Sequence, residues 1–105
     1  MTIRYSFAEK FTRFPGGRLR KHGPFSGEAF RDDVLLPLLK ENDVVTIDIT
    51  GVRGFGSSFL DEAFAEAGKR LGRVEARRRL QFECADDPGL LAMIDAKIEK
   101  ALATT

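Results

Sequence analysis

The clearest structural signal of this 105-residue chain lies in the stretch Val44-Val-Thr-Ile-Asp-Ile49. The stretch is rich in β-branched residues and places apolar side chains at alternate positions, which predicts a central β-strand. It is followed by Gly51-Val-Arg-Gly-Phe-Gly56, whose closely spaced glycines indicate a loop that turns sharply or lies close to other backbone. The rest of the chain can be placed around this strand and loop.

A helix is expected to begin after the glycine loop, at Ser57 or Ser58. With Ser58 as the cap, Asp61 would occupy the third helical position and complete a capping box. The apolar residues that follow at helical spacing are expected to form the buried stripe: Leu60, Ala63, Phe64, Ala67 and Leu71.

A second helix is expected before the strand, capped by Ser26 and ended by Asn42-Asp43. Its buried stripe is expected to comprise Phe30, Val34, Leu35, Leu38 and Leu39. Pro37 falls inside this helix and lacks the amide that would bond to the Asp33 carbonyl, so a kink or a break is expected one turn earlier.

Alternation of apolar and polar residues predicts further strands at 77–84 and, near the N-terminus, at 3–8 and 11–14. The turn Pro15-Gly16-Gly17 leads into 18–24, where a hairpin-like arm is favoured over an exposed basic loop. At the other end, Asp87-Pro88 predicts the start of a helix. Its apolar stripe is expected to comprise Leu90, Leu91, Ile94, Ile98, Ala101 and Leu102.

The order of these elements is β-β-α-β-α-β-α. It predicts an α/β fold with a mixed four- to five-stranded sheet, parallel neighbours joined by helical crossovers, and helices packed mainly on one face. With 43% hydrophobic and 31% charged residues, the chain is expected to form a single domain over 1–105.

The composition argues against several classes of protein. The longest apolar run, around Val34–Leu39, is too short to span a bilayer, and the N-terminus carries no apolar secretory segment, so a cytoplasmic protein without membrane contact is expected. Cys84 stands alone and cannot form an internal disulfide, which fits a reducing compartment. With one His and one Cys, a zinc cluster cannot be assembled, and neither a metal nor a cofactor is expected.

Three blocks of the sequence, 13–18 (Arg-Phe-Pro-Gly-Gly-Arg), 23–31 and 45–64, closely resemble the small bacterial STAS-like domain of unknown function. The resemblance implies a STAS-like fold, related to that of the anti-sigma factor antagonists. In those antagonists an Asp-Ser-Ser-Gly stretch opens a helix, and a kinase-type anti-sigma factor phosphorylates a Ser in it, which breaks their complex. Ser57 matches that Ser, whereas Gly56 and Phe59 replace the flanking Asp and Gly.

The resemblance therefore implies a non-enzymatic role in transcription regulation, through a protein partner of the ATP-binding, anti-sigma kinase type. Docking is expected through the glycine loop and the start of the following helix, by Arg53, Phe55, Gly56, Ser57, Ser58, Phe59, Asp61 and Glu62. Ser57 and Ser58 are the candidates for phosphorylation, and helix capping is the alternative role for both. A hydrolase is a poorer account, because His22 lies on a distant turn and no glycine stands two residues after the Ser.

An uneven charge distribution leaves a second function open. Residues 1–25 hold six basic residues against one acidic, and residues 67–80 again hold six against one. Basic patches at 13–22 and 77–79 would suit a nucleic-acid-associated accessory protein, whose binding would weaken steeply with salt. The residues concerned are Arg13, Arg18, Arg20, Lys21, Arg77, Arg78 and Arg79. Separate, solvated charges are the alternative interpretation.

Overall fold

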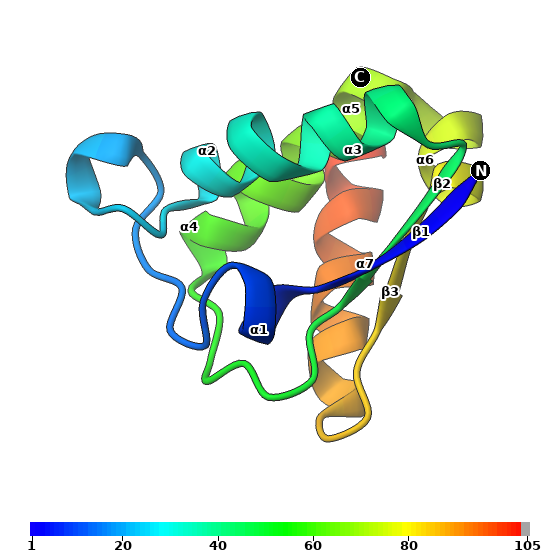
Figure 1. Ribbon diagram of the computed structural model, residues 1–105. Helices are drawn as coiled ribbons and strands as arrows, with labels where there is room; N and C mark the ends of the chain where they lie inside the picture. Colours follow the sequence, from blue (N-terminus) through cyan, green and yellow to red (C-terminus); the bar gives the residue numbers. More distant parts are fainter. Residues whose placement is uncertain (104–105) are drawn as a thin grey trace.

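The computed structural model describes residues 1–103, and its centre is a sheet of three parallel strands. The strands are β1 (Thr2–Ser6), β2 (Val44–Asp48) and β3 (Leu80–Glu83), in the spatial order β1-β2-β3 (Figure 1). The predicted central strand is therefore confirmed as β2. The expectation of a mixed sheet of four to five strands is wrong, because both pairings in the described chain are parallel and no further strand joins them.

Two long helical segments and one C-terminal helix pack on this sheet. The first segment comprises α2 (Gly27–Phe30), the π-helical turn η2 (Arg31–Leu35) and α3 (Leu36–Glu41). The second comprises α4 (Ser57–Leu60), the π-helical turn η3 (Asp61–Ala65) and α5 (Glu66–Leu71). They are completed by α6 (Arg73–Arg79), α7 (Pro88–Ala103), the short α1 (Phe7–Lys10) and the 3₁₀ turn η1 (Arg20–His22). Among residues 1–103, no helix combines the length and the apolar character needed to cross a membrane.

The predicted strand at 11–14 does not form. The backbone amides of Phe11 and Thr12 both donate to the carbonyl of Phe7, at 2.9 and 3.0 Å, and so close the helical turn α1. The ring of Phe11 also packs edge-on against those of Phe7 and Phe30, at 5.2 and 5.1 Å between centroids. The apolar side chain that suggested a strand is thus used to anchor a turn on the core.

Residues 18–24 form an exposed loop around η1, so the favoured hairpin-like arm is also wrong. The carbonyls of Gly17 and Arg18 instead accept from the amides of Gly27 and Glu28, each at 3.0 Å. The first amides of a helix have no partner within the helix, and here the preceding loop satisfies them.

The helix predicted from Ser26 is confirmed, and its cap is formed by the Ser26 hydroxyl, which accepts from the Ala29 amide at 3.1 Å. Around Asp33, one turn before Pro37, the helix does not break but widens into the π-helical turn η2. The missing proline amide was expected to disturb the bonding at this place, and the helix continues through it with π-type bonding.

The predicted strand at 77–84 begins only at Leu80, because Arg77–Arg79 close helix α6. The Arg79 guanidinium donates to the carbonyls of Leu39, Asn42 (3.1 Å) and Asp43 (2.9 Å), at the C-terminal end of α3. Unpaired carbonyls at a helix end favour a cation, and this contact holds α6 in place beside the sheet.

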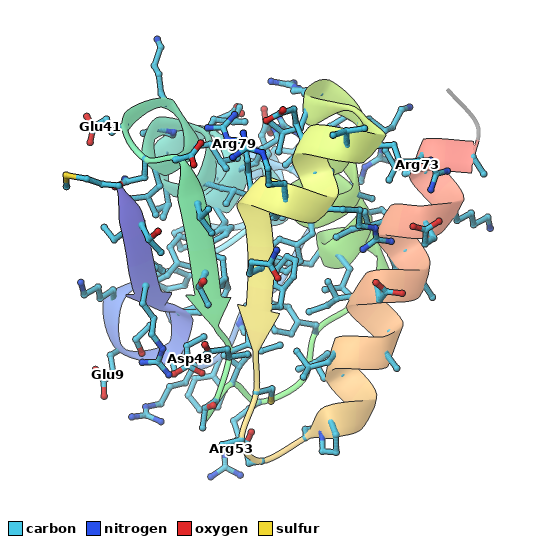
Figure 2. All side chains as sticks on the ribbon, turned by 90° about the vertical axis from the view of Figure 1, so that its right-hand side faces the viewer. Glu9, Glu41, Asp48, Arg53, Arg73 and Arg79 are labelled. Carbon is cyan, nitrogen blue, oxygen red and sulfur yellow. The ribbon has the colours of Figure 1, made fainter. Side chains whose placement is uncertain are left out.

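The helices cover one face of the sheet. Val45 and Ile47 on β2 are fully buried against them, together with aromatic residues of α1, α2 and α4. On the opposite face, Arg4 bridges Asp48 at 2.7 Å and Glu83 at 2.9 Å, across all three strands shown side by side in Figure 2. A parallel sheet is usually covered on both faces, and here polar side chains make an uncovered face tolerable.

Candidate functional site

The candidate site lies at the carboxyl end of the sheet, where β2 runs into the glycine loop 51–56 and then α4 (Figure 1). Gly51 and Gly54 have φ angles of 86° and 75°, in the left-handed region that favours glycine. In Figure 2, the side chain of Arg53 points away from the body of the protein. Ligands of open α/β sheets commonly bind at this end of the strands.

The two phenylalanines of the predicted docking surface lie mostly inside the protein. Phe59 is only 1% exposed, so the structure removes its side chain from the predicted partner-binding set. Phe55 is half-buried, with its ring 5.1 Å from that of Phe7 and 5.3 Å from that of Phe59. Both rings anchor the loop on the core, which leaves Arg53, Gly54 and Gly56 as its exposed members.

Ser57 and Ser58 are exposed at the start of α4, but neither acts as the predicted helix cap. Gly56 holds the cap position and contributes no side chain, so the predicted capping box does not form. The Ser57 hydroxyl oxygen instead accepts from Lys97 Nζ at 2.6 Å, and Lys97 also forms an ion pair with Asp61 at 3.2 Å. Ser57 is thus the serine with a charged neighbour.

Sequence reasoning missed Lys97 because it lies on α7, forty residues from Ser57. The only local signal was its place between Ile94 and Ile98 in the buried stripe of that helix, which puts it at the border of the core. Such a signal indicates that the side chain lies at a helix interface but does not name its partner.

Glu62 has a structural role at the contact between the two long helical segments. It pairs with Arg31, which is only 7% exposed, and with Arg18 at 2.7 Å. Burial alone would raise the pKa of Glu62, but hydrogen bonds from Arg18 and Arg31 outweigh it and hold the pKa below its ordinary value. Asp61 is exposed and lies closer to the serine site.

The basic residues proposed for nucleic acid do not form one patch. The loop that carries Arg18 and Arg20 and the helix α6 that carries Arg77–Arg79 lie at opposite ends of the molecule in Figure 1. Arg20 pairs with Asp33 at 2.7 Å, and Arg78 pairs with Asp43 at 3.0 Å. Most of this charge is therefore already matched by carboxylates within the chain.

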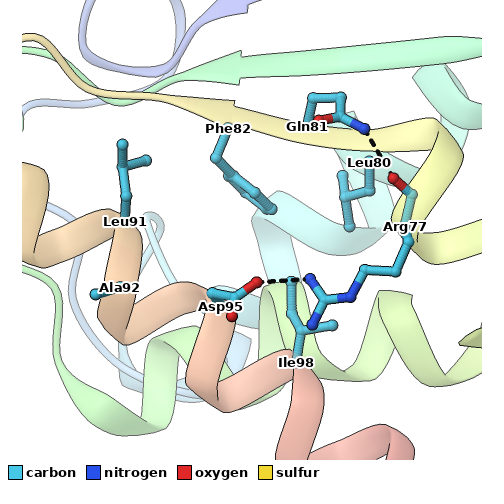
Figure 3. Close-up of a pocket in the computed structure, with 8 residues that line it drawn as sticks. All are labelled: Arg77, Leu80, Gln81, Phe82, Leu91, Ala92, Asp95 and Ile98. Atoms are coloured by element: carbon cyan, nitrogen blue, oxygen red, sulfur yellow. Dashed lines mark hydrogen bonds and ion pairs between the residues drawn. The ribbon is translucent and has the colours of Figure 1, made fainter.

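A pocket elsewhere lies between the free edge of β3 and α7 (Figure 3). Leu80, Phe82 and Ile98 form its apolar wall. Its charged members are satisfied by one another, because Arg77 donates to Asp95 at 2.8 Å and Gln81 donates to the Arg77 carbonyl at 2.8 Å. The Arg77 and Asp95 side chains are thus engaged with each other, and the lining of the pocket includes no residue of the glycine loop.

The titratable side chains that sequence analysis singled out as possible reactive or metal-binding groups lie apart from one another or form local contacts. Within the described residues there is no cluster of three or more His, Cys, Asp or Glu that could hold a metal ion. His22 accepts from the Leu19 amide at 3.2 Å in η1, and the Cys84 thiol has a pKa raised mainly by burial. Lys97 donates to the Ser57 hydroxyl oxygen and is paired with Asp61.

These features define a small α/β domain whose helices cover one face of a parallel sheet and whose exposed loop and helix start present serines and an arginine. The family model described as "STAS-like domain of unknown function (DUF4325)" matches residues 26–90, and the chain belongs to this family. The match confirms the resemblance seen in the blocks from Ser26 onward, while block 13–18 lies outside it. The comparison with curated proteins gave no match, and neither did the comparison with solved structures.

Proposed function

We propose that this domain is a non-enzymatic regulatory module that docks a protein partner through the glycine loop and the start of α4. The supporting observation is that exposed side chains stand next to rings that are packed in the core. Arg53, Ser57 and Ser58 are exposed, while Phe55 and Phe59 beside them are fixed in the aromatic core. A preorganised surface loses little conformational entropy when it binds, which favours affinity.

The proposed switch is phosphorylation of Ser57. A phosphate there would lie at the first turn of the helical segment 57–71 and beside Lys97, so the fold would tolerate its charge. The same phosphate would add bulk and negative charge to the docking surface. Modification is thus expected to change binding and not folding.

The proposed partner is an ATP-binding regulator of the anti-sigma kinase type, and the proposed role is in transcription regulation. Both rest on the likeness of Ser57 and its surroundings to the phosphorylated helix start of anti-sigma factor antagonists. The family assignment supports the shared fold on which this likeness depends.

The test is affinity capture from a lysate of the native host, with wild-type protein and Ser57→Asp as baits and protein identification by mass spectrometry. Ala96→Asp is the matched control, because it adds the same charge at an exposed position of α7. We expect an ATP-binding regulator with wild type and with the control, and its loss with Ser57→Asp. Recovery of the same regulator by all three baits would refute the switch, and recovery of nucleic acid alone would refute protein docking.

A further inference from the structure

All but two of the arginines described in this protein are paired with carboxylates. Within residues 1–103, each arginine forms an ion pair apart from Arg13 and Arg53. These two are neighbours in space although forty residues separate them, because the Arg53 amide donates to the Arg13 carbonyl at 2.7 Å. Both side chains are exposed. Two exposed arginines on joined segments, neither of them in an ion pair, offer positive charge to a negatively charged ligand.

Asp86, which interacts with the charge of Arg53, forms no ion pair with it. Asp86 lies close enough to Arg53 to sense its charge, but it accepts from the Gly51 amide at 3.0 Å and from the Cys84 thiol at 3.1 Å. The guanidinium of Arg13 lies over Gly51, where a side chain on that glycine would stand only 3.0 Å from it. The absence of a side chain on Gly51 therefore leaves room for the Arg13 guanidinium against the loop.

The segment that carries Arg13 also carries exposed aromatic side chains. Phe14 is 69% exposed and Phe25 is 42% exposed. Their segments are joined, because the Gly16 amide donates to the Phe25 carbonyl at 3.0 Å, and the Phe25 ring rests on that of Phe11 at 5.5 Å. Aromatic and arginine side chains are the types that contribute most to the binding energy of protein interfaces.

We propose that the docking surface extends from the glycine loop onto Arg13, Phe14 and Phe25, and that it recognises an acidic protein segment bearing an apolar side chain. The carboxylates would bind the two guanidiniums, and the apolar group would cover the exposed rings. This inference rests on the proposed docking function and names the chemistry of the partner. It also gives a role to residues 11–25, a segment without strand or long helix that is hydrogen-bonded to the glycine loop through Arg13.

The charge pattern favours a protein segment over nucleic acid. Nucleic-acid binding depends on several cations that neutralise successive phosphates. The next arginines along this loop, Arg18 and Arg20, are instead paired with Glu62 and Asp33. Two unpaired arginines on joined segments, with exposed aromatic rings on one of these segments, suit a short acidic and apolar segment better.

The test is selection of a random peptide library displayed on phage against the wild-type protein, after clearing with the double variant Arg13→Glu/Arg53→Glu. Enriched peptides are then synthesised and titrated calorimetrically. We expect sequences in which Asp or Glu flanks an apolar residue, with affinity reduced about tenfold by each charge reversal. Phe14→Ala is expected to lower the affinity for the same peptides.

The matched control is Lys40→Glu/Lys100→Glu, which makes the same charge change at exposed lysines that form no ion pair in the described chain. It should change affinity less than about twofold, and equal thermal midpoints should show that all variants fold. Enrichment of peptides without acidic residues, no enrichment, or equal binding to both double variants would overturn the proposal. So would binding of single-stranded oligothymidylate that is lost with Arg13→Glu/Arg53→Glu while no peptide binds.

The same peptides separate this inference from the proposed switch. If Arg13→Glu/Arg53→Glu abolishes peptide binding while the Ser57→Asp bait still captures the host regulator, the acidic-segment surface stands and the switch fails. If the host partner is lost with Ser57→Asp but retained by Arg13→Glu/Arg53→Glu, the switch stands and the extended surface fails.

Discussion

The residue with the greatest structural consequence is Arg31, a nearly buried cation at the meeting point of the two long helical segments. It donates to the Glu62 carboxylate, to the Glu62 carbonyl at 3.1 Å and to Asp32 at 2.8 Å. These interactions are made inside the protein, where Arg31 is largely shielded from solvent. A charge in such a place stabilises the fold only while all its partners remain.

Replacing Arg31 by Met should therefore destabilise the protein strongly, because it leaves the mostly buried carboxylate of Glu62 with Arg18 alone. We expect a loss of about 3 kcal/mol in the free energy of unfolding, measured by urea denaturation. The control is Arg70→Met, whose guanidinium is exposed and stands 3.9 Å from Glu66 on the same helix. That change should cost no more than about 0.5 kcal/mol; equal losses for both variants would contradict a special role for Arg31.

At the scale of elements, the contact between the helical segments depends on Gly27. A β-carbon added there would stand 2.9 Å from the Phe59 carbonyl oxygen and 3.1 Å from Glu62 Cβ. The first neighbour is backbone and cannot move aside easily. The start of α2 can therefore approach α4 only because this position lacks a side chain.

Gly27→Ala is expected to lower the free energy of unfolding by about 2 kcal/mol, although alanine is the better helix former. Thermal or urea denaturation measures this loss. Gly16→Ala serves as control, because no atom lies within 4 Å of its added β-carbon and its φ angle is not positive. A neutral or stabilising effect of Gly27→Ala would show that the two segments can move apart at no cost.

The elements that the sequence predicted correctly carry their own local signals. The alternation of β-branched residues in β2, the Ser26 cap and the Asp87-Pro88 start of α7 each lie within a few residues of the element they define. The errors arose where distant atoms decide the conformation. The conformation of residues 11–14 is set by hydrogen bonds to the Phe7 carbonyl. The position of Arg79 is set by hydrogen bonds to carbonyls at the end of α3.

The candidate site shows the same division. The glycines and serines placed the loop and the helix start correctly, because backbone freedom and helix entry are local properties. Lys97 and Arg13 were not associated with this site, since they reach it from α7 and from the N-terminal loop. Phe59 was assigned to the surface because its spacing alone does not show that Phe7 and Phe30 surround it.

At the scale of the whole molecule, pairing of arginines with carboxylates joins elements that lie far apart in the sequence. Arg77 on α6 binds Asp95 and Glu99 on α7, and Arg78 on α6 binds Asp43 before β2. Hydrogen bonds from these arginines are the largest cause of the lowered pKa of Asp43 and of Glu99. In Asp32 and Asp33 the pKa is lowered by Arg31 and Arg20 in the same way.

The direction of these pKa changes predicts that acid unfolds the protein. A carboxyl group whose pKa is lower in the folded state binds fewer protons there than in the unfolded chain. Its stabilising effect is therefore complete at a pH above its ordinary pKa, which is 4.5 for Glu62. The effect is lost as the pH falls through the pKa of the folded state. We therefore expect the free energy of unfolding to stay nearly constant from about pH 7 to about pH 5 and to fall steadily below that. Urea denaturation across this pH range measures the free energy of unfolding.

Glu62→Gln should be less stable at neutral pH and should lose less further stability in acid, because this position no longer titrates. A free energy of unfolding that is flat or rising below pH 4.5 would mean that the arginine pairs contribute little to the fold.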